Sequence, residues 1–198
     1  MTPYITEVTP LTIAGWTIRF KIPNISRIAD IPAFEYTPIF EEENRNQLSN
    51  KPYKLREHFK KSDSIKHGEF YMIYDVDRIH EEFDFLYGIS IVDPNDKENI
   101  PPDAASVEIS GLYAIFQSPL IEEDGDMEQV IKDLWNHIMT EWLPESEFEY
   151  DRSRRDFEHY DKRSHRQFFG GKKQMDIYLP IRQSEKAFRE AEKKGRVF

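Results

Sequence analysis

The chain has 198 residues, no cysteine, and 37 acidic against 27 basic residues, for a formal net charge of −10. This length suits one large domain or two small halves that share a core, and the missing cysteine excludes disulfide bonds, thiol catalysis and cysteine-type zinc sites. The acidic balance argues against a nucleic-acid-binding surface on the scale of the whole protein.

The first half, about residues 5–92, predicts one strand, one helix and two further strands. In chain order these are a strand at 5–22, a helix at 31–48, and strands at 69–76 and 83–92. Pro10 indicates a bend in the first strand, and Pro38 indicates that the helix begins late or kinks. The short connection 77–82 suits a hairpin.

Residues 93–104 read as a linker rich in proline and aspartate, and the same order of elements then begins again. The second half, about residues 105–182, predicts a strand at 106–118, a helix at 127–142 and strands at 156–161 and 174–182. Asp124-Gly-Asp126 supplies capping residues at the start of this helix, and Pro144 ends it. A short amphipathic helix at 184–195 follows outside the repeat.

Two strings about 90 residues apart support a duplication. Residues 83–89 read Phe-Asp-Phe-Leu-Tyr-Gly-Ile, and residues 175–181 read Met-Asp-Ile-Tyr-Leu-Pro-Ile. We therefore expect an α+β fold with tandem strand–helix–strand–strand modules, an antiparallel sheet with helices on one face, and a ligand cleft at the module junction. A chance likeness of two β-hairpins is the alternative.

Strand alternation in the second half predicts which side chains face that cleft. Asp176 and Tyr178 alternate with apolar residues that suit the core, so both are expected in the cleft. If Phe157 packs beneath the helix, Glu158 and Tyr160 face the cleft as well. This set of carboxylates among phenol rings suits a flat or hydrophobic organic cation, because aromatic faces attract cations.

The first half adds weaker candidates to this site. The same alternation brings Asp84 to the cleft with Met72 and Tyr74, and Trp16 and Tyr113 are further ligand-binding candidates on the first strands of the two halves. As an alternative, these acids lie at a solvated rim and pair with Lys or Arg, which has equal weight for Asp84. A basic stretch at residues 151–174 is expected to be a solvated loop region, in preference to an anion site.

Four strings in the second half resemble the gyrase-inhibitor-like domain, also called the AraC-type effector-binding domain. They are Tyr113-Ala-Ile-Phe116, Trp142-Leu-Pro-Glu-Ser146, Asp156-Phe-Glu-His-Tyr-Asp161 and Asp176-Ile-Tyr-Leu-Pro-Ile181. The resemblance implies a tandem fold with a ligand pocket in which Glu158 and Asp176 recognise hydrophobic cations, as in related multidrug sensors. The shorter side chain of Asp176 stands where the family often has glutamate.

Family members that regulate transcription often carry a helix-turn-helix before this domain, but here the first strand begins near residue 5. We therefore expect a sensor, sequestering protein or adaptor in the cytoplasm, with no direct nucleic-acid contact, no membrane span, no signal peptide and no cofactor. A protein partner or a homodimer is a further candidate.

An enzyme is the main alternative to a binding protein. Some members of this fold hydrolyse strained cyclopropane-containing toxins, and Glu158 or Asp176 could act as the general base on water. A metal site is not expected, because His159 should face away from Glu158 on a strand. Residues 162–174 are a candidate lid over the pocket, with a long hairpin turn as the alternative.

Overall fold

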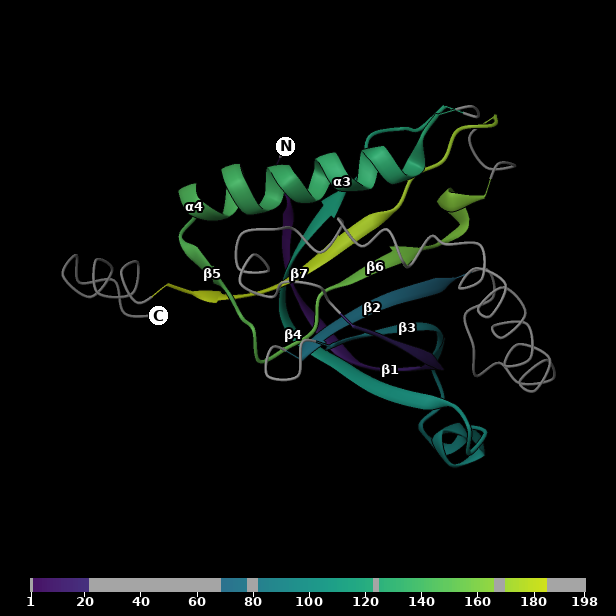
Figure 1. Cartoon of the computed structure of the whole chain (residues 1–198). Coiled ribbons are helices and arrows are strands. Elements are labelled where there is room, and N and C mark those ends of the chain that lie inside the picture. The colour runs from purple at the N-terminus through teal and green to yellow at the C-terminus, as the bar shows by residue number, and fades with distance from the viewer. Residues whose placement is uncertain (1, 22–68, 78–81, 123–124, 166–169, 185–198) are drawn as a thin grey trace.

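The computed structural model describes residues 2–21, 69–77, 82–122, 125–165 and 170–184. Within these ranges, seven strands form one sheet whose pairs are antiparallel, and one long helical segment lies across one of its faces (Figure 1). The strands are β1 (Tyr4–Lys21), β2 (Phe70–Asp77), β3 (Glu82–Ile91), β4 (Ala105–Gln117), β5 (Phe148–Tyr150), β6 (Phe157–Tyr160) and β7 (Asp176–Gln183). The α+β class and the predicted strands are confirmed.

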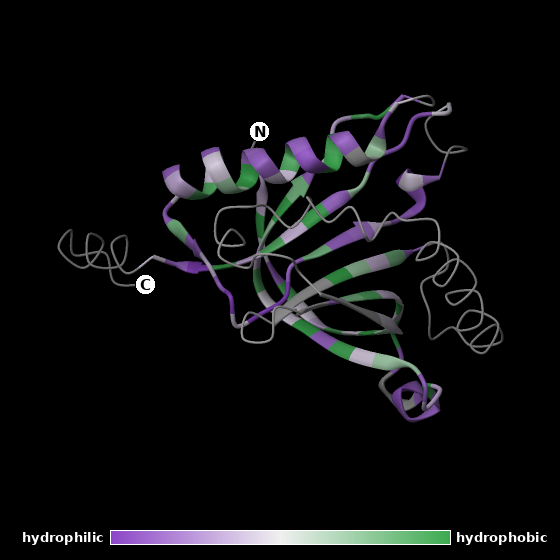
Figure 2. Cartoon of the chain, viewed as in Figure 1, coloured by the Kyte–Doolittle hydropathy of each residue, from purple (hydrophilic) through white to green (hydrophobic). Residues whose placement is uncertain are grey.

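The helix predicted at 127–142 is also confirmed. It consists of α3 (Met127–His137), one π-helical turn, η4 (Ile138–Trp142), and a last turn, α4 (Leu143–Glu145). Asp126 is the N-cap, and its carboxylate accepts a 3.1 Å hydrogen bond from the backbone of the first turn. The apolar residues of α3 recur with helical spacing and face the sheet, whereas the opposite side is polar (Figure 2).

The strand order is β4-β1-β3-β2-β6-β7-β5. An additional pairing of β4 with β7 joins the first six strands of this order into a closed sheet. β1 is 18 residues long and pairs with β4 along its first part and with β3 along its second part. A register shift between Val8 and Leu11 lies where Pro10 predicted a bend. The closed sheet therefore has an inner face and an outer face.

Buried side chains gather in three clusters that correspond to these faces. The first cluster lies between α3 and the outer face of β4 and β7: Ala114, Phe116, Ile131, Leu134, Trp135, Ile138, Met175, Ile177, Leu179 and Ile181. The second lies on the inner face of the closed sheet: Ile13, Tyr71, Ile73, Leu86, Val107, Ile109, Tyr113 and Phe157. The third lies on the outer face of β1 and β3: Ala14, Trp16, Ile89 and Ile91.

Two segments differ from the prediction. The linker predicted at 93–104 contains a 3-10 helix, η3 (Pro94–Asn99), and Ile100 just after it packs against the third cluster. The strand β5 was not predicted, because three residues are too few to show an alternating pattern. The helix predicted at 31–48 lies outside the described residues, as does all but the first residue of the helix predicted at 184–195.

Candidate ligand-binding site

The pairing of β6 with β7 decides which of their side chains share a face. Phe157 lies opposite Tyr178 and His159 lies opposite Asp176, and directly opposite residues in an antiparallel pair point to the same side. Phe157 is a member of the inner cluster and Tyr178 packs against it. All four side chains are therefore on the inner face, where the alternation along β7 predicted Asp176 and Tyr178.

Glu158 and Tyr160 lie on the opposite face, so the orientation predicted for them is wrong. Glu158 is paired with Ile177, which is buried beneath α3, and Tyr160 packs against the same cluster. The Tyr160 hydroxyl donates a 2.6 Å hydrogen bond to the Glu158 carboxylate, whose residue is 1% exposed. The prediction assumed that the apolar Phe157 packs beneath the helix, but Phe157 and Glu158 are both buried, so hydrophobicity does not distinguish the two faces of β6.

Five aromatic side chains from four strands meet on the inner face, and we call them the ring cluster: Tyr71 of β2, Tyr113 of β4, Phe157 and His159 of β6, and Tyr178 of β7. Phe157 stacks on Tyr178 with 4.4 Å between ring centroids, and Tyr71 stacks on His159 with 4.7 Å. The Tyr113 ring meets Phe157 edge-on at 5.6 Å. Burial raises the pKa of Tyr113 and of Tyr178 to about 12, so both rings stay uncharged at neutral pH.

Glu69 lies at the border of the ring cluster and connects two of its members. Its Oε2 atom accepts a 2.9 Å hydrogen bond from the Tyr71 hydroxyl and lies 3.2 Å from Nε2 of His159. Burial, with Glu69 beside it, raises the pKa of Tyr71 well above the usual range. Sequence reasoning did not select Glu69, Tyr71 or His159, because their common face follows only from the pairing of Tyr71 with His159 between β2 and β6.

Asp176 forms a buried ion pair at the same border. The guanidinium of Arg163, in the 3-10 helix η5 (Lys162–Ser164), donates to Oδ2 of Asp176 and to both oxygens of Asp161 at 2.9 and 3.0 Å. Burial disfavours the charge on Arg163, but these hydrogen bonds outweigh burial and raise its pKa. Pairing with Arg was the alternative left open for the acids of this site, and Asp176 makes this pair while only 7% exposed.

The other candidates from the first half are not part of the ring cluster. Trp16 lies in the third cluster on the outer face, and its Nε1 donates a 3.4 Å hydrogen bond to Asp103. The side chain of Tyr74 lies outside the described residues. Asp84 lines a cavity of about 100 Å³ between inner-face residues of the two halves. The residues that line it are Thr17, Ile73, Asp84, Leu86, Ala105, Ser106, Val107 and Arg155.

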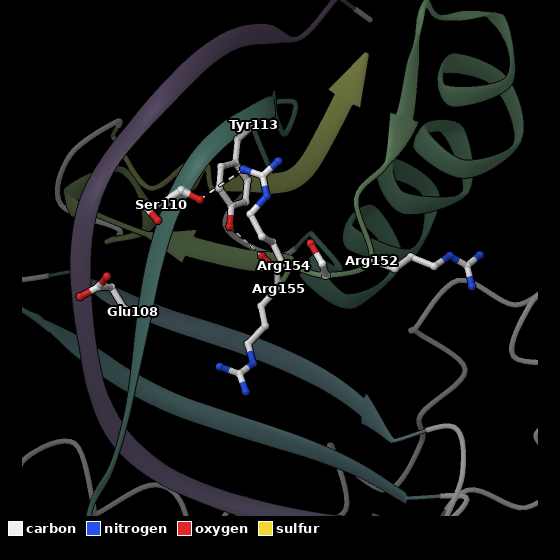
Figure 3. A pocket seen from close by; sticks show the side chains of 7 residues that line it. Glu108, Ser110, Tyr113, Arg152, Arg154 and Arg155 are labelled. Carbon is white, nitrogen blue, oxygen red and sulfur yellow. Dashed lines mark hydrogen bonds between the residues drawn. The ribbon is translucent and has the colours of Figure 1, made fainter. Parts of the chain in front are cut away.

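A second cavity, of about 280 Å³, reaches the edge of the ring cluster at Tyr113 (Figure 3). The Arg154 guanidinium lies 5.3 Å from the centroid of the Tyr113 ring and donates a 3.2 Å hydrogen bond to the Ser110 carbonyl. The side chains of Arg152, Arg154 and Arg155 point in different directions in Figure 3. They do not converge on one anion, but the segment is not simply solvated as expected, because Arg154 bonds to Asp151 and to two backbone carbonyls and Arg163 to Asp176. The lining residues are Glu108, Ser110, Tyr113, Arg152, Ser153, Arg154 and Arg155.

No three His, Asp or Glu side chains in the described part of the chain are placed to hold a metal ion together. Among the helices that the structure describes, none has the length and apolar character that a membrane crossing requires.

The model of the family of integron-associated effector binding proteins matches residues 5–181. A comparison with curated proteins finds no match. Solved structures with a similar fold include SAV2435 bound to tetraphenylphosphonium, at 13% identity and a TM-score of 0.51, over 92% of this chain and 94% of that one. A transcription regulation protein from Staphylococcus aureus MU50 is also similar, at 13% identity and a TM-score of 0.50, over 92% of this chain and 99% of that one.

An integron cassette protein from the mobile metagenome of Vibrio cholerae is 17% identical, over 91% of this chain and 96% of that one, with a TM-score of 0.47. At such identities the structural likeness shows the fold alone. The family match spans most of the chain and confirms the gyrase-inhibitor-like resemblance of the four strings in the second half. The chain belongs to the family of integron-associated effector binding proteins.

Proposed function

We propose that this protein binds a small hydrophobic organic molecule, cationic or aromatic, on the ring cluster. The observation that carries the proposal is the meeting of five aromatic side chains from four strands on one face, with the carboxylates of Glu69 and Asp176 at their border. Ring faces attract organic cations, and nearby carboxylates add to that attraction. Apolar burial of the ligand body contributes in the same place.

The similarity to SAV2435 supports this choice of ligand class. That protein was solved with tetraphenylphosphonium, which has a single positive charge surrounded by four phenyl rings. A ligand of this kind matches an aromatic site with acidic neighbours. We carry the ligand class, and not the ligand's position, over to this chain.

We further propose that the chain is a duplication and that its ligand lies at the junction of the halves. The strands of the half at 5–92 pair with those of the half at 105–182 through β1–β4 and β2–β6. The ring cluster draws Tyr71 from the first half and its other four members from the second. A ligand on this cluster would therefore touch both halves.

The rings of the cluster lie in mutual contact, with 4.4 Å between the centroids of Phe157 and Tyr178 and 4.7 Å between those of Tyr71 and His159. Insertion of tetraphenylphosphonium between these rings therefore requires that they separate. Tyr178 is the ring we expect to move, because it is only partly buried whereas Phe157 is 1% exposed.

The hydrolase alternative receives less support from this geometry. Glu158 lies on the α3 face, away from the ring cluster, and Asp176 is held by Arg163. A role as an effector sensor in transcription regulation is a further proposal that rests on the family alone. Incubating the protein with a candidate substrate and following its consumption by mass spectrometry separates an enzyme from a binding protein.

Calorimetric titration with tetraphenylphosphonium tests the proposed function. We expect saturable binding, and the Tyr178→Leu variant should weaken it at least fivefold, since a cation–ring contact contributes about 1 kcal/mol. Tyr160→Leu is the matched control, because Tyr160 lies on the other face of the adjacent strand, and its affinity should stay within about twofold. Equal losses in the two variants, or no binding by the parent protein, would overturn the proposal.

A further inference from the structure

Two buried polar atoms at the border of the ring cluster have no hydrogen-bond partner in the described part of the chain. They are Oδ1 of Asp176 and Nδ1 of His159. The two residues are directly opposite on β7 and β6, and Asp176 is 7% exposed. Buried polar atoms are nearly always paired, so an unpaired set points to a missing partner.

In the neutral form of His159, both atoms are hydrogen-bond acceptors. Nε2 of His159 lies 3.2 Å from the Glu69 carboxylate, which can only accept, so Nε2 carries the hydrogen. In the neutral imidazole this leaves Nδ1 without a hydrogen. In Asp176, Arg163 donates to Oδ2, and Oδ1 has no hydrogen-bond partner among the described residues.

Charged and aromatic groups surround His159 from several segments. Glu69 just before β2 and Tyr71 in β2 face it, Asp176 and Tyr178 face it from β7, and Asp161 lies close enough to interact electrostatically from the residue before η5. The Tyr71 hydroxyl is already donated to Glu69, and Arg163 is shared between Asp161 and Asp176. In the described part of the chain, no group donates a hydrogen bond to Nδ1 of His159 or to Oδ1 of Asp176.

Opposite residues in an antiparallel pair have Cβ atoms about 4.5–5.5 Å apart, so one nitrogen with two hydrogens can reach both acceptors. We propose that His159 and Asp176 select ligands whose aromatic body carries a primary ammonium, amidinium or similar group with at least two N–H bonds. The body of such a ligand lies on Tyr178 and Phe157, and its nitrogen replaces a water that bridges the acceptors in the free protein. This inference rests on the proposed function and narrows its ligand class.

A matched pair of compounds separates the hydrogen-bond requirement from the charge requirement. 4-Phenylbenzylamine is a primary ammonium at pH 7.5, and its N,N,N-trimethyl derivative has the same rings and charge but no N–H bond. Calorimetry should show at least a tenfold preference for the primary ammonium, because hydrogen bonds to a charged group are the stronger ones. The His159→Phe variant keeps a ring but loses the acceptor, and the preference should fall to about twofold.

His137→Phe is the control, since His137 lies on α3 and its ring nitrogen contacts Glu141 at 2.7 Å. This variant should keep the full preference. Should His159→Phe fail to unfold cooperatively, Asp176→Asn serves as the second variant, because its amide alters the acceptor pair at constant size. A loss of preference in that variant supports the inference, and an unchanged preference contradicts it.

The possible outcomes separate the two proposals. Equal affinity of the parent protein for the two biphenyl compounds overturns the donor requirement while leaving the proposed function in place. If neither biphenyl compound nor tetraphenylphosphonium binds, the proposed function itself fails. Tighter binding of the trimethyl derivative would mean that charge and ring contact alone select the ligand, and would also overturn the inference.

Discussion

Replacing Phe157 by Leu tests whether the inner face is the ligand site and not merely part of the core. Phe157 is 1% exposed and contacts three rings, with centroid distances of 4.4 Å to Tyr178, 5.6 Å to Tyr113 and 6.0 Å to Tyr71. The exchange between two apolar side chains costs roughly 1 kcal/mol in lost apolar contacts, and each lost ring pair adds about 0.5–1.5 kcal/mol. With three ring pairs lost, we expect Phe157→Leu to lower the free energy of unfolding by about 2–5 kcal/mol.

Phe116 provides the matched control on the other face of the sheet. It is also fully buried, but it lies beneath α3 and meets the edge of Trp142 at a centroid distance of 4.9 Å. Phe116→Leu should lower the free energy of unfolding by about 1–3 kcal/mol for the same physical reasons. The two variants thus lose overlapping amounts of stability at fully buried positions on opposite faces of the sheet.

The assays are urea unfolding followed by circular dichroism, and calorimetric titration with tetraphenylphosphonium well below the unfolding transition. Phe157→Leu should weaken binding by about fivefold or more, since a ring contact to a cation contributes about 1 kcal/mol. Phe116→Leu should stay within about twofold of the parent. Equal weakening in both variants would show that affinity follows global stability, and would refute the assignment of the site to the inner face.

Three further predictions concern the framework of the site. Arg154→Ala should lower the free energy of unfolding in urea by about 2–3 kcal/mol, because it removes bonds to Asp151 at 2.8 Å and to two backbone carbonyls; an unchanged urea midpoint would contradict this. Asp126→Ala should cost about 1 kcal/mol and Asp126→Asn much less, as measured by thermal unfolding, since only the latter keeps an N-cap acceptor; equal losses would contradict the cap. In an absorbance titration, Tyr113→Phe should remove one phenol from the component that ionises near pH 12, and removal from the component near pH 10 would contradict its burial.

The sign of the alkaline effect follows from the same phenols. In the folded state the pKa of Tyr113 and of Tyr178 is about 12, above the ordinary value of 10.0. Burial of the neutral phenols therefore contributes stability that is fully present below pH 10 and is lost as the pH rises towards 12. Tyr113→Phe should reduce this loss of stability between those two pH values.

The sequence predicts those parts of the fold in which only one side of an element is buried. The apolar stripe of α3 and the bend of β1 at Pro10 both follow from local pattern and were both confirmed. The face assignment of β6 failed because Phe157 and Glu158 are both buried, so neither hydrophobicity nor charge marks the side that meets α3. The pairing of β4 with β7 that closes the sheet cannot be predicted from the sequence either, because pairing of distant strands depends on register and not on local composition.

Only part of the candidate site could be predicted, because only part of it follows from the alternation along a single strand. Asp176 and Tyr178 alternate with apolar residues that pack against a helix the sequence also predicts, so their inward direction follows from one strand alone. Glu69, Tyr71 and His159 come together only through the pairing of β2 with β6, which joins residues about 90 positions apart. A contact of that range has no signal in a single strand.

The charges at the border of the ring cluster explain how Asp176 can be paired by Arg163 and the site still favour a cation. Arg163 is shared by two carboxylates, Asp161 and Asp176, and a third carboxylate, Glu69, faces His159. Three carboxylates and one guanidinium therefore lie at this border. A bound cation would therefore reduce the mutual repulsion of the acids without displacing Arg163, and high salt should weaken its binding less than for a fully exposed acidic surface, because buried charges are screened least.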